Sequence, residues 1–383
     1  MAGIYLHIPF CRQACSYCDF HFSTNLSRQK DMVAAIAQEA QLQQNYFAPE
    51  TEIRSIYFGG GTPSLLTETQ LCLLLDELQS NFRIAADAEI TLEANPDDLD
   101  RKQLAALIRA GVNRLSIGVQ SFHDHDLALM RRSHNADQAR LAIREAQELG
   151  FDNISLDLIY GIPGSNMAAW QANVQETLAL NVQHISAYAL TVEEKTLLHH
   201  QVHKEKVTLP KDQAYQQQYF YLIAALEAAG FAHYELSNFA QPGFRSQHNS
   251  SYWTGTPYLG LGPSAHSFRG RNRAWNVAQN ARYLAALAAG KTAVQETETL
   301  SDRDRLNEYL MTHFRKAEGV HLAYLLNEFE FDLRKQESLK LHEFEAEGWL
   351  SEIAGHLVLS REGKMVSDYI IRELFQIDPE SKP

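Results

Sequence analysis

Three of the four cysteines in this sequence lie close together near the amino terminus, with a spacing that could support metal chemistry. Cys11, Cys15 and Cys18 follow the pattern CxxxCxxC, so one short loop could present three thiolates to a single cluster. A structural zinc site or an electron-transfer four-iron cluster normally uses four protein ligands. The remaining cysteine, Cys72, lies far along the chain in a predicted amphipathic helix. We therefore expect a [4Fe-4S] cluster with one iron left open to a small molecule.

Three other interpretations of this loop remain open. A disulfide is disfavoured, because the chain shows no secretory signal and thiols stay reduced in the cytosol. The cysteines could be buried structural residues, although Pro9, Ser16 and Asp19 are unusual in the interior of a packed strand or helix. A zinc site could be completed by His7 or His21.

Composition and charge narrow the class of protein. The 383 residues are 45% apolar and 21% charged, as expected of a globular protein with a full core. The net charge of −13 disfavours general binding to nucleic acid. No run of about 18 apolar residues occurs, so the sequence predicts neither a membrane-spanning helix nor a signal peptide. We expect a cytoplasmic protein that is not integral to a membrane.

The order of predicted elements indicates a parallel sheet that positions the cysteines. Short apolar strands alternate with helical segments about six times, which implies right-handed crossovers between parallel strands. The pattern suits an α/β fold, a partial TIM-like (β/α)6 parallel barrel, in which ligands bind at the carboxyl ends of the strands. The cysteine loop follows the first strand, and other residues suited to a site end the later ones: Gly59–Gly61, Glu93, Gln120, Asp157 and Tyr188.

The rest of the chain has a different pattern. Residues 236–300 mix glycine with polar and aromatic residues, a composition suited to a cleft over a flat ligand. From about residue 301, three predicted helices and a hairpin indicate a mostly helical, winged-helix-like domain. Its 11 Lys and Arg against 17 Asp and Glu disfavour DNA binding, so we expect a lid or docking domain. The predicted domains are a core over 1–235, a connecting segment over 236–300 and the C-terminal domain over 301–383.

Together these motifs resemble the radical S-adenosylmethionine superfamily, in which three cysteines hold the cluster and S-adenosylmethionine occupies the open iron. The resemblance narrows to the oxygen-independent coproporphyrinogen III oxidase group through YLHIPFC, EANP, LSIGVQSF, MRRSHN and SLDLIYGIPG. It implies that Tyr17 packs on the adenine ring. The implied contacts to S-adenosylmethionine are Tyr5, Tyr17, Gly60, Gly61, Thr62, Glu93, Gln120, Arg132 and Asp157.

Two departures distinguish the chain from those oxidases. They carry a further cysteine two positions after the third, where this sequence has Phe20, and the extension that precedes their motif is missing. Both features, with the string His248-Asn249-x-x-Tyr252-Trp253, are similar to the HemW-type heme chaperones. That resemblance implies binding of heme and its transfer to acceptors such as respiratory hemoproteins. Coproporphyrinogen oxidase activity is not expected, and no catalytic residue is predicted.

Heme binding gives the last set of predicted site residues. Imidazole is a normal axial ligand of heme iron, which makes His248 the candidate ligand, with Tyr252 and Trp253 packing on the porphyrin. A structural role for His248 is the alternative, and residues 199–203, otherwise expected as a solvated loop, could supply the ligand instead. An oxidase, or a radical enzyme or regulator with a docking tail, are the alternative functions. We expect a monomer or a homodimer.

Overall fold

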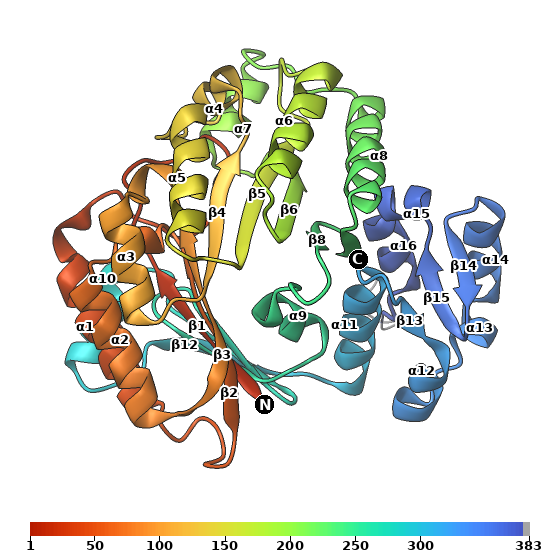
Figure 1. Ribbon diagram of the computed structural model, residues 1–383. Coiled ribbons are helices and arrows are strands. Elements are labelled where there is room, and N and C mark those ends of the chain that lie inside the picture. Colours follow the sequence, from red (N-terminus) through yellow and green to blue (C-terminus); the bar gives the residue numbers. More distant parts are fainter. Residues whose placement is uncertain (378–383) are drawn as a thin grey trace.

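A curved, mostly parallel sheet with helices on its outer face dominates the computed structural model, which describes residues 1–377 (Figure 1). Its six central strands are β1 (Ala2–Ile8), β2 (Glu52–Gly60), β3 (Arg83–Ala94), β4 (Arg114–Gln120), β5 (Ile154–Tyr160) and β6 (His184–Ala189). The connecting helices are α1 (Gln29–Leu42), α2 (Glu68–Asn81), α3 (Arg101–Ala110), α4 (Asp124–Leu129), α5 (Ala136–Glu148) and α6 (Met167–Ala179). Neighbouring strands from β1 to β6 pair in parallel, which confirms the predicted α/β barrel class.

The barrel is open, because further strands, most of them antiparallel, extend both edges of the sheet. Beside β6 lie β8 (Asn238–Ala240) and then β7 (Ala232–Glu235), both in antiparallel pairing. Beside β1 lies the parallel strand β9 (Tyr258–Leu261), followed by antiparallel β10 (His266–Arg269), β11 (Asn272–Asn276) and β12 (Val294–Thr299). None of these six edge strands was predicted individually from the sequence.

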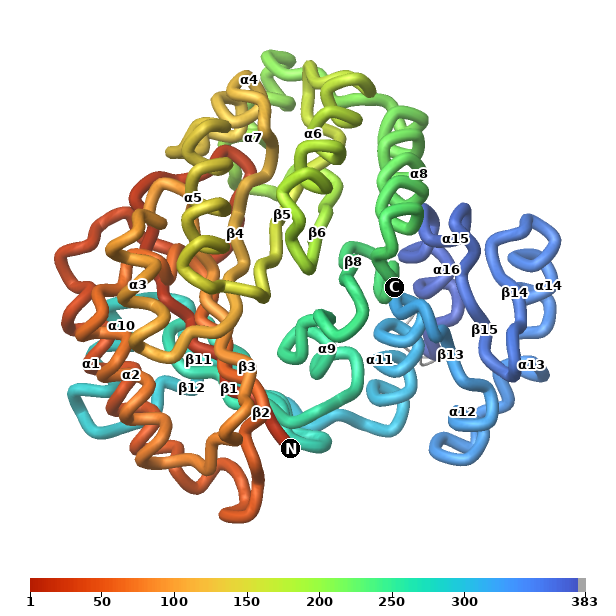
Figure 2. The backbone as a smooth tube through the Cα atoms, viewed as in Figure 1, coloured from red at the N-terminus to blue at the C-terminus, as the bar shows by residue number. Residues whose placement is uncertain are grey.

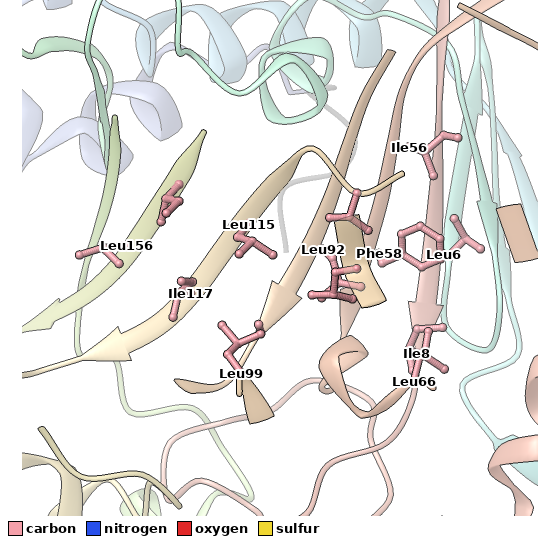
Figure 3. Close-up of a cluster of buried hydrophobic side chains, with 14 of the residues drawn as sticks. Leu6, Ile8, Ile56, Phe58, Leu66, Leu92, Leu99, Leu115, Ile117 and Leu156 are labelled. Atoms are coloured by element: carbon pink, nitrogen blue, oxygen red, sulfur yellow. The ribbon is translucent and has the colours of Figure 1, made fainter. Parts of the chain in front are cut away.

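The parallel strands form because their apolar residues are buried on the side that the helices cover. Leu6, Phe58, Leu92, Leu115 and Leu156 are fully buried and lie across neighbouring strands of one cluster (Figure 3). Burying side chains of this size contributes about 1.5–3 kcal/mol each relative to the exposed state. This shared core fixes the strand order and so places the strand ends next to one another.

Local signals set the ends of the helices. Thr67 and Gln70 form a capping box at the start of α2, and Asn135 and Gln138 form another at the start of α5. α3 ends at Gly111, whose φ of 97° lies in the left-handed region that glycine tolerates. These caps end the helices close to the strands that follow, which keeps the crossovers short.

Four further helices accompany the edge strands: α7 (Leu197–His203), α8 (Asp212–Ala228), α9 (Gln247–Trp253) and α10 (Asn280–Ala288). The segment 199–203, predicted as a loop, belongs to α7, so that prediction was wrong. Its helix begins at a Thr196 side chain that accepts a hydrogen bond from the His199 N–H. α9 lies on the inner side of the curved sheet, near the start of β1 (Figure 1).

Glu39 on α1 ties this helix to the edge strands. The buried carboxylate accepts hydrogen bonds from the Asn276 side chain (2.7 Å), the Gly262 N–H (2.8 Å) and the Tyr283 hydroxyl (2.6 Å). Burial raises the pKa of Glu39 to about 7, because the three donors are neutral and do not offset the loss of solvent. One titratable side chain therefore joins α1, β11 and α10.

The C-terminal unit has a hydrophobic cluster of its own. Its elements are α11 (Asp302–Phe314), β13 (Val320–His321), α12 (Leu322–Phe329), α13 (Leu333–Gln336), α14 (Ser338–Ala346), β14 (Leu350–Ile353), β15 (His356–Leu359), α15 (Arg361–Met365) and α16 (Ser367–Leu374). α13 and α14 are separated at Glu337, and α15 and α16 follow the hairpin of β14 and β15. Leu236 also packs in this cluster. The domain boundaries given above stay predictions.

Within residues 1–377, no helix combines the length and the apolar character that crossing a bilayer requires.

Candidate functional site

The cysteine loop follows β1 and is fastened to the segment between α4 and α5. The Ser16 N–H and hydroxyl donate to the Met130 and Leu129 carbonyls, each at 3.0 Å. The Cys11 N–H donates to the Ser23 carbonyl at 3.1 Å, which closes the loop at its base. Arg12 and the buried carboxylate of Asp98 form an ion pair at 2.7 Å. These bonds hold the loop over the carboxyl ends of the strands, as predicted.

Cys11, Cys15 and Cys18 are all free thiols and partly buried. Burial raises the pKa of Cys11, and it raises the pKa of Cys18 to about 11. Within the described part of the chain, no group of three or more His, Cys, Asp and Glu side chains could hold a single metal ion. A four-iron cluster does not need such convergence, because each thiolate binds a different iron. The donor set therefore fits a cubane cluster better than zinc.

The histidines that could have completed a zinc site have other partners. His7 Nε2 hydrogen-bonds with the His21 carbonyl at 2.8 Å, and His21 Nε2 hydrogen-bonds with Asn280 Oδ1 at 2.7 Å. Burial lowers the pKa of His7 to about 4. Both rings are thus used to join the cysteine loop to β1 and to the start of α10.

The glycines that end β2 allow the cysteine loop to approach closely. Gly60 has a φ of 105°, and a Cβ there would lie 2.6 Å from the His7 ring. A Cβ on Gly61 would lie 2.6 Å from the Phe10 carbonyl oxygen. The Gly61 N–H donates to the Ile8 carbonyl at 2.9 Å, and the Gly60 N–H donates to Glu93 at 3.2 Å. These amides have partners within the chain, so the glycines here mainly make room for the loop.

Arg132 joins the loop to the ends of two strands. Its guanidinium donates to Cys15 Sγ (3.4 Å), to the Asn95 side chain (2.6 Å) and to the Gly118 carbonyl (2.7 Å). Its Nε is buried and has no hydrogen-bond partner. Gln120 lies close by, since a Cβ on Gly118 would be 2.8 Å from Gln120 Nε2 and 3.1 Å from Arg132. This unpaired donor beside a cysteine sulfur could bind an anionic group.

Two carboxyl groups, Glu93 and Asp157, lie inside the barrel close enough to repel each other. Glu93 accepts hydrogen bonds from the Tyr57 hydroxyl at 2.9 Å and from the Gly60 amide, and Asp157 accepts from Ser116 at 3.3 Å. Burial raises the pKa of Glu93 to about 7 and that of Asp157 to about 6, and their mutual repulsion adds to the rise for Glu93. A bound cation would favour the charged form of both groups.

The remaining predicted contacts to S-adenosylmethionine lie around this interior. Tyr5 points into it from β1, with its ring 6.1 Å from the Tyr57 ring. Tyr17 packs against the cluster that contains Leu127 and Met130. Thr62 is buried, and its hydroxyl lies 3.5 Å from Asn95 Nδ2. Hydrogen bonds thus connect Thr62, Asn95 and Arg132 to one another, and Arg132 to Cys15 of the cysteine loop.

The predicted heme ligand His248 lies at the opposite end of the barrel from the cysteines. A Cβ on Gly3, near the start of β1, would be 3.2 Å from its ring, and 1% of the residue is exposed. Its Nδ1 hydrogen-bonds with the Ser55 hydroxyl at 2.9 Å and its Nε2 with the Tyr252 hydroxyl at 3.0 Å. Burial lowers the pKa of His248 to about 3. Whichever ring nitrogen bound iron would first have to lose its hydrogen-bond partner.

Arg114, at the start of β4, is a buried charge that the sequence analysis missed. Its side chain is 1% exposed, its Nε lies 4.0 Å from Glu89, and its Nε and Nη1 have no hydrogen-bond partner. Glu89 in turn accepts the N–H groups of Gln247 and His248 at 3.0 and 3.1 Å. The signal that could have found it was an arginine within the apolar strand sequence RLSIGV.

The chain is similar to known proteins over nearly its whole length. The radical SAM superfamily model matches residues 5–176, and the HemN C-terminal domain model matches residues 300–366. The chain is 32% identical to the heme chaperone HemW of Bacillus subtilis over 97% of this chain and 98% of that protein. It is 35% identical to HemW of Mycobacterium tuberculosis H37Rv over 97% and 94%, and 33% identical to HemW of Escherichia coli K12 over 97% of each chain.

Among solved structures, the coproporphyrinogen III oxidase HemN from Escherichia coli is similar in fold. The TM-score is 0.84 over 98% of this chain and 90% of that one, at 22% sequence identity. At that identity the likeness establishes the architecture and leaves the activity open.

Proposed function

The chain belongs to the HemW family of radical SAM proteins, and from this membership we propose that it binds heme and passes it to acceptor proteins. The observation that carries the proposal is the match over nearly the whole chain to relatives named heme chaperones. The acceptors we propose are hemoproteins such as those of respiration, and the proposed compartment is the cytoplasm.

The proposed cluster ligands are the three free thiols of the cysteine loop. Cys11, Cys15 and Cys18 would hold a [4Fe-4S] cluster, and S-adenosylmethionine would occupy the iron that has no protein ligand. Once reduced, such a cluster can supply one electron to the sulfonium of S-adenosylmethionine. The thiols must lose their protons to bind iron, so assembly should be favoured by raised pH.

Residues around the cysteine loop have charges and positions suited to binding S-adenosylmethionine. Glu93 and Asp157 offer carboxylates to its amino group or ribose hydroxyls, and Arg132 offers its unpaired Nε to the carboxylate. Tyr17 lies in the loop itself, where its ring can pack on adenine. Tyr5, Gly60, Gly61, Thr62 and Gln120 complete the proposed set, with the glycines acting by making room.

Anaerobic reconstitution with iron and sulfide tests the cluster. We expect about four iron and four sulfide per chain. Cys15→Ala should lose the visible absorption and most of the iron, whereas Cys72→Ala, which changes a cysteine on α2, should keep both. Equal iron content in both variants would contradict the assignment of the loop.

A hemin titration combined with an oxidase assay tests the function. We expect a Soret band and its shift on addition of hemin, and no decarboxylated product from coproporphyrinogen III under reducing, oxygen-free conditions. Turnover of coproporphyrinogen III would instead establish the chain as an oxidase.

A further inference from the structure

A cavity of about 750 Å³ lies between the core and the C-terminal unit, and we call it the interdomain cleft. One side is formed by α9 with β9, β10 and β11, and the other by α11 and α12. Figure 2 shows α9 facing α11 and α12. Aromatic side chains line both sides: Trp253, Tyr258 and Phe268 from the core, and Tyr309, Tyr324 and Phe329 from the C-terminal unit. Two aromatic walls around a space of this size suit a flat, largely apolar ligand.

The cleft also contains an imidazole in a state suited to binding iron. His313 Nδ1 lies 3.0 Å from the Tyr309 carbonyl oxygen, which can only accept, so Nδ1 carries the proton. Its Nε2 then holds a lone pair, and it makes no hydrogen bond within residues 1–377. The His313 ring also stacks on the Tyr309 ring at 3.7 Å. A backbone carbonyl on one nitrogen commonly orients a metal-binding histidine and leaves the other nitrogen free for the metal.

The cleft offers a positive charge for the carboxylates of a porphyrin. Lys316 lines it and takes part in no ion pair among the described side chains. Arg273 and Arg305 also line it, but Arg273 pairs with Glu308 and Arg305 with Glu328. Lys316 is therefore the cation that a ligand carboxylate could neutralise without displacing an acidic side chain.

Two other histidines, His321 and His356, also line the cleft. The rings of His321 and His356 stack on each other at 4.4 Å, across the pairing of β13 with β15. His321 is exposed, and neither ring stacks on an aromatic wall. His248 does not line the cleft, although its hydrogen-bond partner Tyr252 does. His356 Nδ1 likewise lies 3.2 Å from a backbone carbonyl oxygen, that of Ala354. Among these imidazoles, His313 is the one whose ring stacks on Tyr309 of the aromatic wall.

We propose that heme binds in the interdomain cleft, with His313 Nε2 as an axial ligand of its iron, the aromatic walls against the macrocycle and Lys316 beside a propionate. The inference rests on the proposed function and moves the ligand from the predicted His248 to a histidine of the C-terminal unit. Trp253 keeps its predicted place against the porphyrin, and Tyr252 lines the same cavity. No bond other than iron to nitrogen forms.

The test compares hemin with metal-free protoporphyrin IX on the full chain. His313→Ala should weaken hemin binding by at least about tenfold, since even the partners of metal-ligating histidines contribute that much. It should leave protoporphyrin IX binding within about twofold, because the walls remain. Added imidazole should restore the Soret position of the variant. The matched control is His342→Ala, which changes an exposed histidine of the same unit and should bind both porphyrins as the wild type does.

Each outcome decides the assignment. If His313→Ala weakened hemin and protoporphyrin IX binding equally, the axial role of His313 would be overturned. It would also be overturned if His248→Ala, His321→Ala or His356→Ala lost hemin binding while His313→Ala kept it. Lys316→Glu should weaken both porphyrins, and unchanged binding would remove the proposed propionate contact. A wild-type chain that binds no hemin would refute the proposed function itself, which separates that failure from a misplaced cleft.

Discussion

The titration of Glu39 should make the stability of the protein depend on pH in a defined way. The carboxyl is fully buried, and its pKa rises from 4.5 to about 7 on folding because burial outweighs three neutral hydrogen bonds. A group whose folded pKa is raised contributes its stability below the unfolded pKa and loses it as pH rises through the folded value. Stability should therefore fall between pH 4.5 and about pH 7.

The magnitude follows from the same two values. The interval between 4.5 and about 7 corresponds to about 3 kcal/mol of unfolding free energy, at 1.36 kcal/mol for each pH unit. Glu39→Gln serves as the reference, because an amide of the same shape does not titrate. The Glu39→Gln variant also differs in stability from the wild type, because its side-chain NH2 group would face a hydrogen-bond donor of Gly262 or Asn276. That difference does not depend on pH.

Urea unfolding of both chains between about pH 5 and about pH 8 measures the effect. The stability of the wild type relative to Glu39→Gln should fall by about 2–3 kcal/mol over that range. A difference that stays constant would refute the reasoning. It would mean that the three donors stabilise the carboxylate as well as water does, so that Glu39 remains charged when folded.

Three more predictions concern other buried groups. Gly161→Ala should destabilise by about 1–3 kcal/mol in urea unfolding, because φ is +73° and the new Cβ would lie 1.9 Å from the Tyr215 ring. Gly150→Ala, with φ of +101° and open space, should cost about 1 kcal/mol, and an equal loss would contradict the steric argument. Arg114→Ala should cost about 3–5 kcal/mol by leaving Glu89 buried without its cation, and a loss below about 1 kcal/mol would show that the pair contributes little. Raising pH through about 7 should strengthen S-adenosylmethionine binding as Glu93 ionises, and Glu93→Gln should flatten that pH profile.

The sequence predicted the parts of the fold that depend on local pattern. The alternation of strands and helices predicted the parallel sheet. The polar residues at the strand ends indicated a site at the carboxyl edge of that sheet. Glu93 and Gln120 could be placed there because carboxyl ends of parallel strands share one edge, whereas Arg132 was predicted only from the family resemblance. What residues 199–203 form depended on a weaker signal, the Thr196 cap, and the loop prediction failed for that reason.

Contacts between segments far apart in the sequence could not be predicted in the same way. β12 is exposed at every position and shows no apolar alternation, so nothing in its sequence indicates a strand. The partners of Gly60 and Gly61 are other parts of the chain, which a glycine-rich string does not reveal. The cleft residues Trp253 and His313 are 60 positions apart in sequence, and only folding brings the two segments to opposite walls of one cavity.

The two walls of the interdomain cleft lie on elements that pack in separate hydrophobic cores, such as β9 in one and α11 in the other. The joint between the cores includes hydrogen bonds from the Leu236 N–H to the Arg315 carbonyl and from the Ala317 N–H to the Tyr234 carbonyl. Side chains cross the joint as well, because Arg245 pairs with Glu318 at 3.0 Å and Lys364 hydrogen-bonds with His233 at 3.0 Å. A rotation that widened the cavity would have to break such contacts, but neither core would have to unfold. Under the proposed function, opening this joint would release heme while both hydrophobic cores stay folded.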